Sequence, residues 1–240
     1  MKPIPLDERR AILMDHEGWF GSAAPEFQQA VLSRCGWREV GAGQLIYSAS
    51  DSQADPCGIV DGTVEIYSRL GAGDNPMLHL THEGSWIGYG SALRDLPPRV
   101  TAVARTAVLL AHVPSHVMQD LLRKRPEWWR FVAFSVLEYG DIAISAYADS
   151  LLQSKDRRCA STLLRVAGLQ YPRRSRPGGR PVPVTQDELA TMVSVSRTTL
   201  LQILRRFEER GLVEQAYRGV RVIDADGLKE VAEGRTGLRE

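Results

Sequence analysis

Cysteine is scarce in this sequence, with three residues among 240 and no C-x-x-C pair. Cys35, Cys57 and Cys159 are odd in number and lie far apart, which argues against a disulfide framework and against a cysteine metal or iron–sulfur site. We therefore expect reduced thiols, a cytoplasmic location and no iron–sulfur cluster.

Long apolar runs are also missing, since no run approaches the roughly 20 residues that are needed to span a bilayer. The N-terminal stretch MKPIPLDERRAILMDHEGWF has acidic residues early and no continuous apolar segment, so we expect neither a signal peptide nor a membrane partner. At 43% apolar and 25% charged residues, the composition is that of a soluble protein with one large or two ordinary domains.

The chain has little net charge, +1, but the charge is unevenly distributed. Residues 1–154 hold 13 Lys and Arg against 18 Asp and Glu, a net of −5. Residues 155–240 hold 17 against 11, a net of +6. A basic C-terminal third on a near-neutral chain is typical of a phosphate-binding module joined to another domain.

The pattern along the chain changes twice before residue 154. Residues 1–34 are helical in pattern, whereas from Gly36 to about Pro114 short β-prone runs alternate with Gly, Asp, Asn and Pro. Many short strands with frequent turn signals predict an antiparallel sandwich or barrel. A short helix then ends at Pro126, and residues 127–153 continue without a proline as one long helix.

Apolar residues recur at intervals of seven in the long helix. Two such series are Val132, Tyr139 and Ala146, and Leu137, Ile144 and Leu151. Heptad spacing predicts that the helix packs against a twin in a homodimer. The alternative is that one apolar face packs on the barrel of its own chain.

The C-terminal third begins with another predicted helix, residues 155–169, followed by a Pro/Gly/Arg-rich loop or loose hairpin, residues 170–183. A capping box then opens a helix, because Thr185 is followed three residues later by Glu188. Ser196 is the predicted N-cap of a second helix, which ends at Gly211.

The second helix has a buried stripe at i, i+3, i+4 and i+7, formed by Leu200, Ile203, Leu204 and Phe207. Two strands that turn at Arg218-Gly219 should follow it. Two helices joined by a short turn and followed by a hairpin predict a winged helix-turn-helix.

Such a second helix places its N-terminal side chains on base edges in the major groove, where Arg197 suits bidentate contact with guanine. Hydroxyls, guanidinium groups and helix N-terminal amides suit the phosphates. The predicted DNA-binding residues are Thr185, Ser196, Arg197, Thr198, Thr199, Leu201, Gln202, Arg205, Arg218 and Arg221. The alternatives are a helical hairpin with a solvated basic face and a winged helix used only for protein contact.

The segment VTQDELATMVSVSRTTLLQILRRFEERGLV closely resembles the helix-turn-helix of the CRP/FNR family of bacterial transcription regulators. GIVDGTVEIY and GSWIGYGSAL resemble two segments of that family's effector β-barrel, and the order of parts is the same. The resemblance implies an α+β chain with an N-terminal antiparallel β-barrel of the double-stranded β-helix or jelly-roll type. The expected parts are an effector-type barrel domain at 1–125, a dimerisation helix at 126–154 and a winged helix-turn-helix at 155–240. Double-stranded DNA and a second copy of the chain are the implied partners, and RNA polymerase is a further candidate.

The segment GSWIGYGSAL, residues 84–93, is called the effector segment below. It and the residues that follow it depart from the pattern of the cyclic-AMP-binding members. Tyr89 stands where they carry a ribose-binding Glu, and LPPRVTAV replaces their phosphate-binding Arg-Ser, so that Arg99 is at most a displaced remnant. The candidate pocket residues are Trp86, Ile87, Gly88, Tyr89, Gly90, Ser91 and Arg99. Because an anionic phosphate in a barrel needs a cation and donors, we expect no control by cyclic AMP, and the effector stays unnamed.

The recognition helix departs too, since Thr198 replaces the family's cytosine-binding Glu and Gln202 replaces an Arg. Leu201 could contact a thymine methyl, so the half-site should differ from that of the cyclic AMP activator.

A small barrel can also be a metal enzyme. His79, His82, Glu83, His112 and His116 are clustered in sequence, and His79 is also a loose candidate for a haem ligand. On a strand, however, residues i and i+3 point to opposite faces, so His79 and His82 could converge only across a bend. We therefore expect neither a catalytic site nor a metal site, and keep two alternatives: a cyclic-nucleotide-responsive regulator, and a metal-binding barrel enzyme whose winged helix does not bind DNA.

Overall fold

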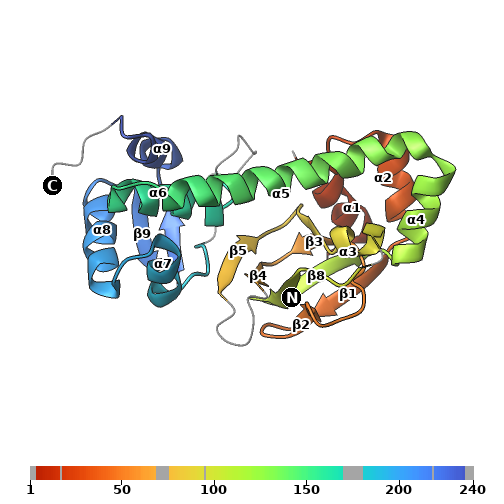
Figure 1. The fold of residues 1–240 in the computed structure, drawn as a ribbon, viewed down its shortest axis with the longest axis horizontal. Helices are drawn as coiled ribbons and strands as arrows, with labels where there is room; N and C mark the ends of the chain where they lie inside the picture. The colour runs from red at the N-terminus through yellow and green to blue at the C-terminus, as the bar shows by residue number, and fades with distance from the viewer. Residues whose placement is uncertain are drawn as a thin grey trace. The chain divides into compact units, whose positions relative to one another are not determined.

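The computed structural model describes residues 4–16, 18–68, 76–94, 96–169, 181–217 and 219–235 (Figure 1). They fall into two compact units, residues 1–139 and residues 140–240. The boundary lies within the long helix, between Tyr139 and Gly140, rather than at either of its ends.

Two antiparallel four-stranded sheets form the β part of the first unit. Their orders are β1-β8-β3-β6 and β2-β7-β4-β5, which is a jelly roll whose sheets stay separate instead of closing into a ring. The strands are β1 Gly36–Val40, β2 Leu45–Tyr47, β3 Cys57–Asp61, β4 Val64–Ser68, β5 Met77–Thr81, β6 Trp86–Ile87, β7 Val100–Ala104 and β8 Val108–His112. The predicted antiparallel β domain is confirmed.

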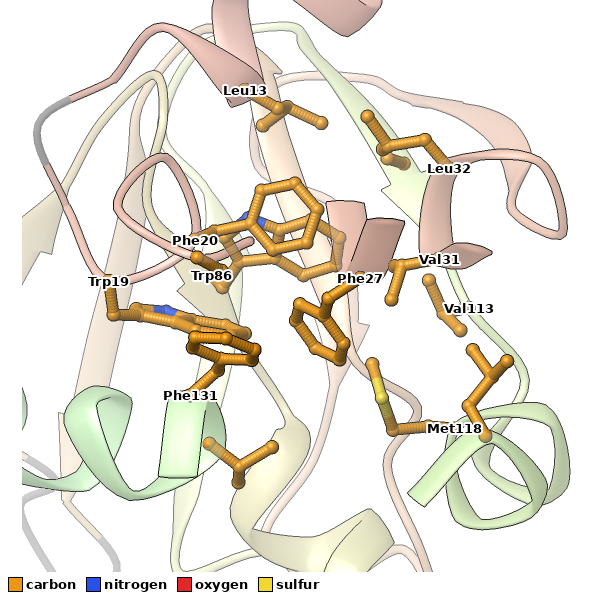
Figure 2. Packing of buried hydrophobic residues seen from close by; sticks show 14 of the residues in the cluster. Leu13, Trp19, Phe20, Phe27, Val31, Leu32, Trp86, Val113, Met118 and Phe131 are labelled. Carbon is orange, nitrogen blue, oxygen red and sulfur yellow. The ribbon is translucent and has the colours of Figure 1, made fainter. Parts of the chain in front are cut away.

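Two hydrophobic cores stabilise this unit. One lies between the sheets and includes Ile59, Val64, Ile87 and Leu110. The other is rich in aromatic side chains, and Figure 2 shows Trp19, Phe20, Phe27, Trp86 and Phe131 within it. Each such side chain contributes about 1.5–3 kcal/mol through burial. Because Phe27 and Phe131 come from helices, the helices are part of the core of the first unit.

In the described part of the first unit, four helices and one 3-10 turn accompany the sheets. They are α1 Leu6–Met14, α2 Pro25–Leu32, α3 Tyr89–Arg94, α4 Ser115–Lys124 and η1 Pro126–Trp128. The predicted N-terminal helical region and the helix before Pro126 are thereby confirmed. The short helix α3 was not predicted, and it places the effector segment on a helical turn.

The long helix α5 spans Trp129–Ser150 and is shared by the two units. The two heptad series differ in their surroundings. Val132 is buried in the aromatic core, whereas Leu137, Ile144 and Leu151 are 61%, 67% and 63% exposed in the single chain. By length and composition alone, the helical stretch Pro126–Ser150 could also cross a membrane, since an 18-residue window within it has a mean hydropathy of 1.2.

The second unit contains α6 Lys155–Val166, α7 Gln186–Val193, α8 Arg197–Glu209, β9 Val213–Ala216, β10 Gly219–Val222 and α9 Ala225–Glu233. This is the predicted winged helix-turn-helix, with an additional C-terminal helix that was not predicted. Of the predicted loop at residues 170–183, residues 170–180 lie outside the described residues.

The wing differs from the prediction at Gly219. This residue was predicted to lie in the turn, but it is the first residue of β10 and pairs with Ala216 of β9. A Cβ on Gly219 would lie 2.6 Å from the carbonyl oxygen of Val182, which bridges to Val220. The glycine thus permits a close backbone approach, which a sequence pattern cannot distinguish from a turn.

Candidate nucleic-acid interface and effector segment

Side-chain caps fix both helices of the helix-turn-helix. Thr185 Oγ1 accepts a hydrogen bond from the Glu188 backbone N–H at 3.2 Å, and Glu188 Oε2 accepts one from the Thr185 N–H at 2.7 Å. Ser196 Oγ accepts from the Thr199 N–H at 3.1 Å. Ser194 ends α7 in the left-handed conformation with φ 55°, so the chain reverses within three residues. The predicted capping box and N-cap are both present.

The two faces of α8 are sharply different. Leu200, Ile203, Leu204 and Phe207 are buried, as the periodicity predicts. On the other face, Arg197, Thr198, Gln202 and Arg205 are exposed, and Leu201 is partly buried. An exposed face of hydroxyl, amide and guanidinium groups next to a helix N-terminus has the chemistry that base edges and phosphates require.

Arg197 is held by the preceding helix. Its Nη2 donates to Gln186 Oε1 at 3.1 Å, and its Nε lies 3.6 Å from Asp187 Oδ1. Gln186, Asp187 and Gln215 were not among the predicted site residues, because their common location depends on how two helices and a strand pack. No spacing in the sequence brings these three residues together.

The wing presents a paired cation and an aromatic residue. Arg221 Nη1 donates to Glu214 Oε2 at 2.7 Å across the hairpin, in an exposed ion pair that is worth little in solvent. Tyr217, at the tip, is 94% exposed. Arg218, also predicted to contact DNA, lies outside the described residues.

The candidate pocket residues go to different surroundings. Trp86 and Tyr89 pack in the aromatic core, Ile87 packs between the two sheets, and Arg99 is exposed. Gly88 has φ +83°, and a Cβ there would lie 2.2 Å from the Asp55 carbonyl oxygen. A glycine is therefore required at this position.

The following residues, Gly90 and Ser91, continue into α3. Ser91 Oγ is buried, accepts from the Ala54 N–H at 2.9 Å and donates to the Leu96 carbonyl at 2.5 Å. Its hydroxyl is thus used within the protein.

Two tyrosines join the effector segment to α5. The Tyr89 hydroxyl donates to the Ser135 carbonyl at 3.0 Å, and the Tyr139 hydroxyl donates to the Trp86 carbonyl at 2.8 Å. Burial, and then the neighbouring Tyr139, raise the pKa of Tyr89, so its hydroxyl stays a neutral donor. Tyr89, at the position where the cyclic-AMP-binding members are expected to carry a Glu, therefore bonds to the long helix.

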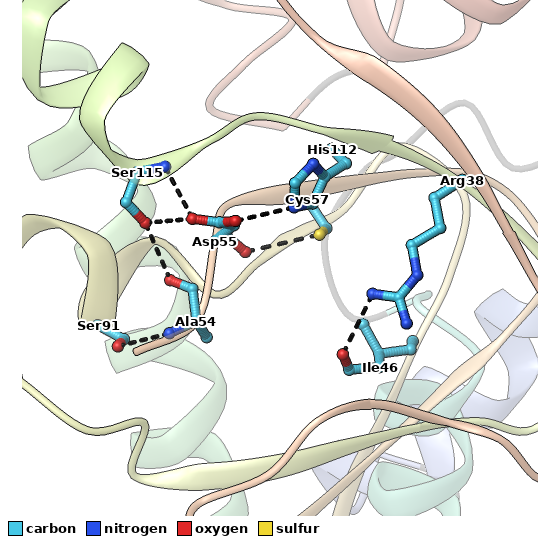
Figure 3. Close-up of polar contacts among 8 residues, drawn as sticks. All are labelled: Arg38, Ile46, Ala54, Asp55, Cys57, Ser91, His112 and Ser115. Carbon is cyan, nitrogen blue, oxygen red and sulfur yellow. Dashed lines mark hydrogen bonds and ion pairs between the residues drawn. The ribbon is translucent and has the colours of Figure 1, made fainter. Parts of the chain in front are cut away.

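Asp55 organises the polar side of the same segment (Figure 3). It accepts from the Ser115 backbone N–H at 2.7 Å, from the Ser115 hydroxyl and from His112 Nε2 at 2.9 Å. Burial alone would raise the Asp55 pKa, but the hydrogen bonds from Ser115 and the neighbouring His112 outweigh it and lower the pKa. The carboxylate thus joins the start of α4 to the end of β8.

The candidate metal ligands do not assemble. Within the described residues, no three His, Cys, Asp or Glu side chains are placed to hold a metal ion. His112 pairs with Asp55, while His82 Nδ1 lies 3.2 Å from Thr63 Oγ1.

A jelly roll followed by a long helix and a winged helix-turn-helix defines a class of two-domain DNA-binding regulators. Residues 37–125 match the cyclic nucleotide-binding domain, and residues 157–231 match the Crp-like helix-turn-helix domain. The chain belongs to the CRP/FNR family of transcription regulators.

The three relatives that follow are distant in sequence. The cAMP-activated global transcriptional regulator CRP of Salmonella typhimurium is 23% identical over 156 residues, which cover 65% of this chain and 74% of that protein. A regulatory protein from Silicibacter pomeroyi DSS-3 superposes with a TM-score of 0.66 at 20% identity, covering 95% of this chain and 99% of its own. A c-di-GMP responsive global regulator from Xanthomonas campestris gives 0.60 at 19% identity, covering 83% and 99%. These likenesses establish the fold.

Proposed function

We propose that this CRP/FNR-type regulator binds palindromic DNA as a homodimer and inserts α8 into the major groove of each half-site. The observation that carries the proposal is the exposed face of α8, with Arg197 in its first turn. Thr185, Ser196 and Thr199 lie at helix N-termini and suit phosphates. Thr198, Leu201, Gln202 and Arg205 suit base edges, while the wing residues Arg218 and Arg221 suit the backbone.

Residues 126–154 would form the dimerisation helix. A row of apolar side chains, 61–67% exposed in the single chain, is formed by Leu137 and Ile144 in α5 and by Leu151 directly after it. A twofold helix pair would bury this row and impose twofold symmetry on the DNA site.

The barrel domain would act without cyclic AMP. The tyrosine hydroxyls already link the effector segment to α5, so the contact between sensor and dimer helix needs no ligand. Arg99 is exposed and Ser91 is engaged within the chain, which leaves the cyclic phosphate without the cation and hydroxyl that it needs.

A second candidate is a regulator that responds to a cyclic nucleotide. The match to the cyclic nucleotide-binding domain favours it, and so do relatives whose names state activation by cAMP or a response to c-di-GMP. Titration with these nucleotides separates the two candidates.

We assign no catalytic activity, metal or iron–sulfur cluster to this protein. It would work in the cytoplasm, with RNA polymerase as a candidate partner. The test is selection of bound sequences from random DNA by the purified protein, with and without cyclic nucleotides. A palindromic consensus without added nucleotide supports the proposal. Binding that shows no sequence preference in either condition contradicts it.

A further inference from the structure

The Nε–Nη2 edge of the Arg197 guanidinium is hydrogen-bonded to Gln186. Gln186 Oε1 accepts from Nη2 at 3.1 Å and from Nε at 3.4 Å. Gln186 opens α7 and Arg197 opens α8, so the first helix of the motif holds the first side chain of the second. Asp187 is more distant and more exposed, and therefore contributes less.

A second glutamine connects Gln186 to the far part of α8. Gln215, in β9, accepts through its Oε1 from Gln186 Nε2 at 3.4 Å. The Gln215 backbone N–H and Nε2 donate to the two carboxylate oxygens of Glu208, each at 3.0 Å. A chain of hydrogen bonds thus links Glu208 in α8 to Gln215 in β9, Gln215 to Gln186 in α7, and Gln186 to Arg197 at the start of α8.

The direction of these hydrogen bonds is fixed by chemistry. A carboxylate only accepts and a guanidinium only donates, so the NH₂ group of each intervening amide must face Glu208 and its oxygen must face Arg197. The hydrogen bonds from Gln215 lower the pKa of Glu208, so they favour the carboxylate form, which can only accept. Gln186 is thereby held with its oxygen toward the arginine.

The hydrogen bonds to Gln186 leave the Nη1–Nη2 edge of the guanidinium open, which is the edge that a guanine requires. Arginine has five N–H donors, and Gln186 uses Nε–H and one hydrogen of Nη2. Among the described residues, none accepts from Nη1 of Arg197 in a hydrogen bond. The end formed by Nη1 and Nη2 can therefore donate to O6 and N7 of one guanine.

We propose that Gln186 is a positioning residue for sequence readout, which presents the Nη1–Nη2 edge of Arg197 to a guanine and is itself oriented by Gln215. The proposal rests on the proposed binding of DNA through α8. Because the guanidinium is ordered before DNA arrives, the protein loses less conformational freedom on binding.

The test compares the selected site with a site in which the guanine assigned to Arg197 is replaced in both half-sites. Gln186→Met keeps the side-chain length without the amide, and Gln29→Met is a control at an exposed position of α2, outside both the dimerisation helix and the winged helix. Wild type should discriminate between the sites by about 5- to 150-fold per guanine. Gln186→Met should lose most of that ratio, Gln29→Met should retain it, and Gln215→Met should show a smaller loss.

Two readouts separate positioning from a merely structural role. In the Arg197→Ala background, Gln186→Met should cause no further loss of discrimination, because the two side chains act as one unit. Affinity for unrelated DNA and its salt dependence should stay unchanged, since those report phosphate contacts.

Full discrimination by Gln186→Met overturns the proposal, and so does an equal loss in the Arg197→Ala background. A wild-type protein that prefers no sequence at all refutes the proposed function itself, and the role of Gln186 with it.

Discussion

Tyr89 and Tyr139 lie with their ring centroids 5.9 Å apart. The Tyr89 hydroxyl donates to the carbonyl of Ser135 in α5, and the Tyr139 hydroxyl donates to the carbonyl of Trp86 in β6. The two bonds join α3 and β6 to α5 in both directions. The first part of α5 is thereby bonded directly to the effector segment.

Removing either hydroxyl should weaken this joint. Tyr89→Phe and Tyr139→Phe should each lower the free energy of unfolding by about 0.5–1.5 kcal/mol, because each leaves a carbonyl without its tyrosine donor. Tyr147→Phe is the control, since Tyr147 is exposed on the same helix. Urea unfolding measures all three, and equal stability of the four proteins would contradict the role of the two bonds.

Cyclic AMP and cyclic GMP should not bind with dissociation constants below about 100 µM. Tyr89 brings no charge to the position where a ribose diol would need an anionic acceptor, and Arg99 is exposed. Isothermal titration calorimetry measures this directly. A low-micromolar isotherm with a matching rise in DNA affinity would restore the cyclic-nucleotide switch.

Local patterns predicted local structure well. The stripe from Leu200 to Phe207 and the capping box at Thr185 depend on side chains within one or two turns, so the sequence alone determined them. The bond from Tyr139 to Trp86 joins residues 53 positions apart, and the contact of Gln186 with Gln215 joins residues 29 apart. Such partners depend on the packing of separate elements, which periodicity does not encode.

Arg197→Ala should weaken binding to the selected site by about 1–3 kcal/mol per half-site and relax the preference at one guanine. The loss follows from removing a bidentate donor in the first turn of α8. Fluorescence anisotropy with matched and guanine-substituted duplexes measures both effects. A variant that binds as tightly and selectively as wild type would show that this helix does not read the groove.

The protein should be a dimer at micromolar concentration, with twice the mass of the 26.6 kDa chain. Leu137→Glu or Ile144→Glu should shift it toward monomer, because a charge would enter the apolar seam between two α5 helices. Ser150→Glu, at an exposed polar position of α5, is the control. The half-sites should lie about 34–36 Å apart. Light scattering that finds a 26.6 kDa wild-type species would refute the helix pair.

Asp149 and Arg165 form a buried ion pair in the second unit, and the loss of one partner should strongly lower the free energy of unfolding. Asp149 Oδ2 lies 3.5 Å from Arg165 Nε, and Asp149 Oδ1 accepts from the Ser161 hydroxyl at 2.6 Å. Both charged side chains are buried, and together they join the end of α5 to α6. Burial lowers the pKa of Arg165 and Asp149 opposes that shift, so the guanidinium remains charged and depends on its partner.

Asp149→Leu should therefore cost about 3–5 kcal/mol, because it leaves the Arg165 charge buried without a counter-ion. The double variant Asp149→Leu/Arg165→Met should be more stable than Asp149→Leu, since it removes the uncompensated charge as well. Ser161→Ala should cost only about 0.5–1.5 kcal/mol, the value of one hydrogen bond. Chemical unfolding of the four proteins measures the order, and a double variant less stable than Asp149→Leu would show that the two charges do not act as a pair.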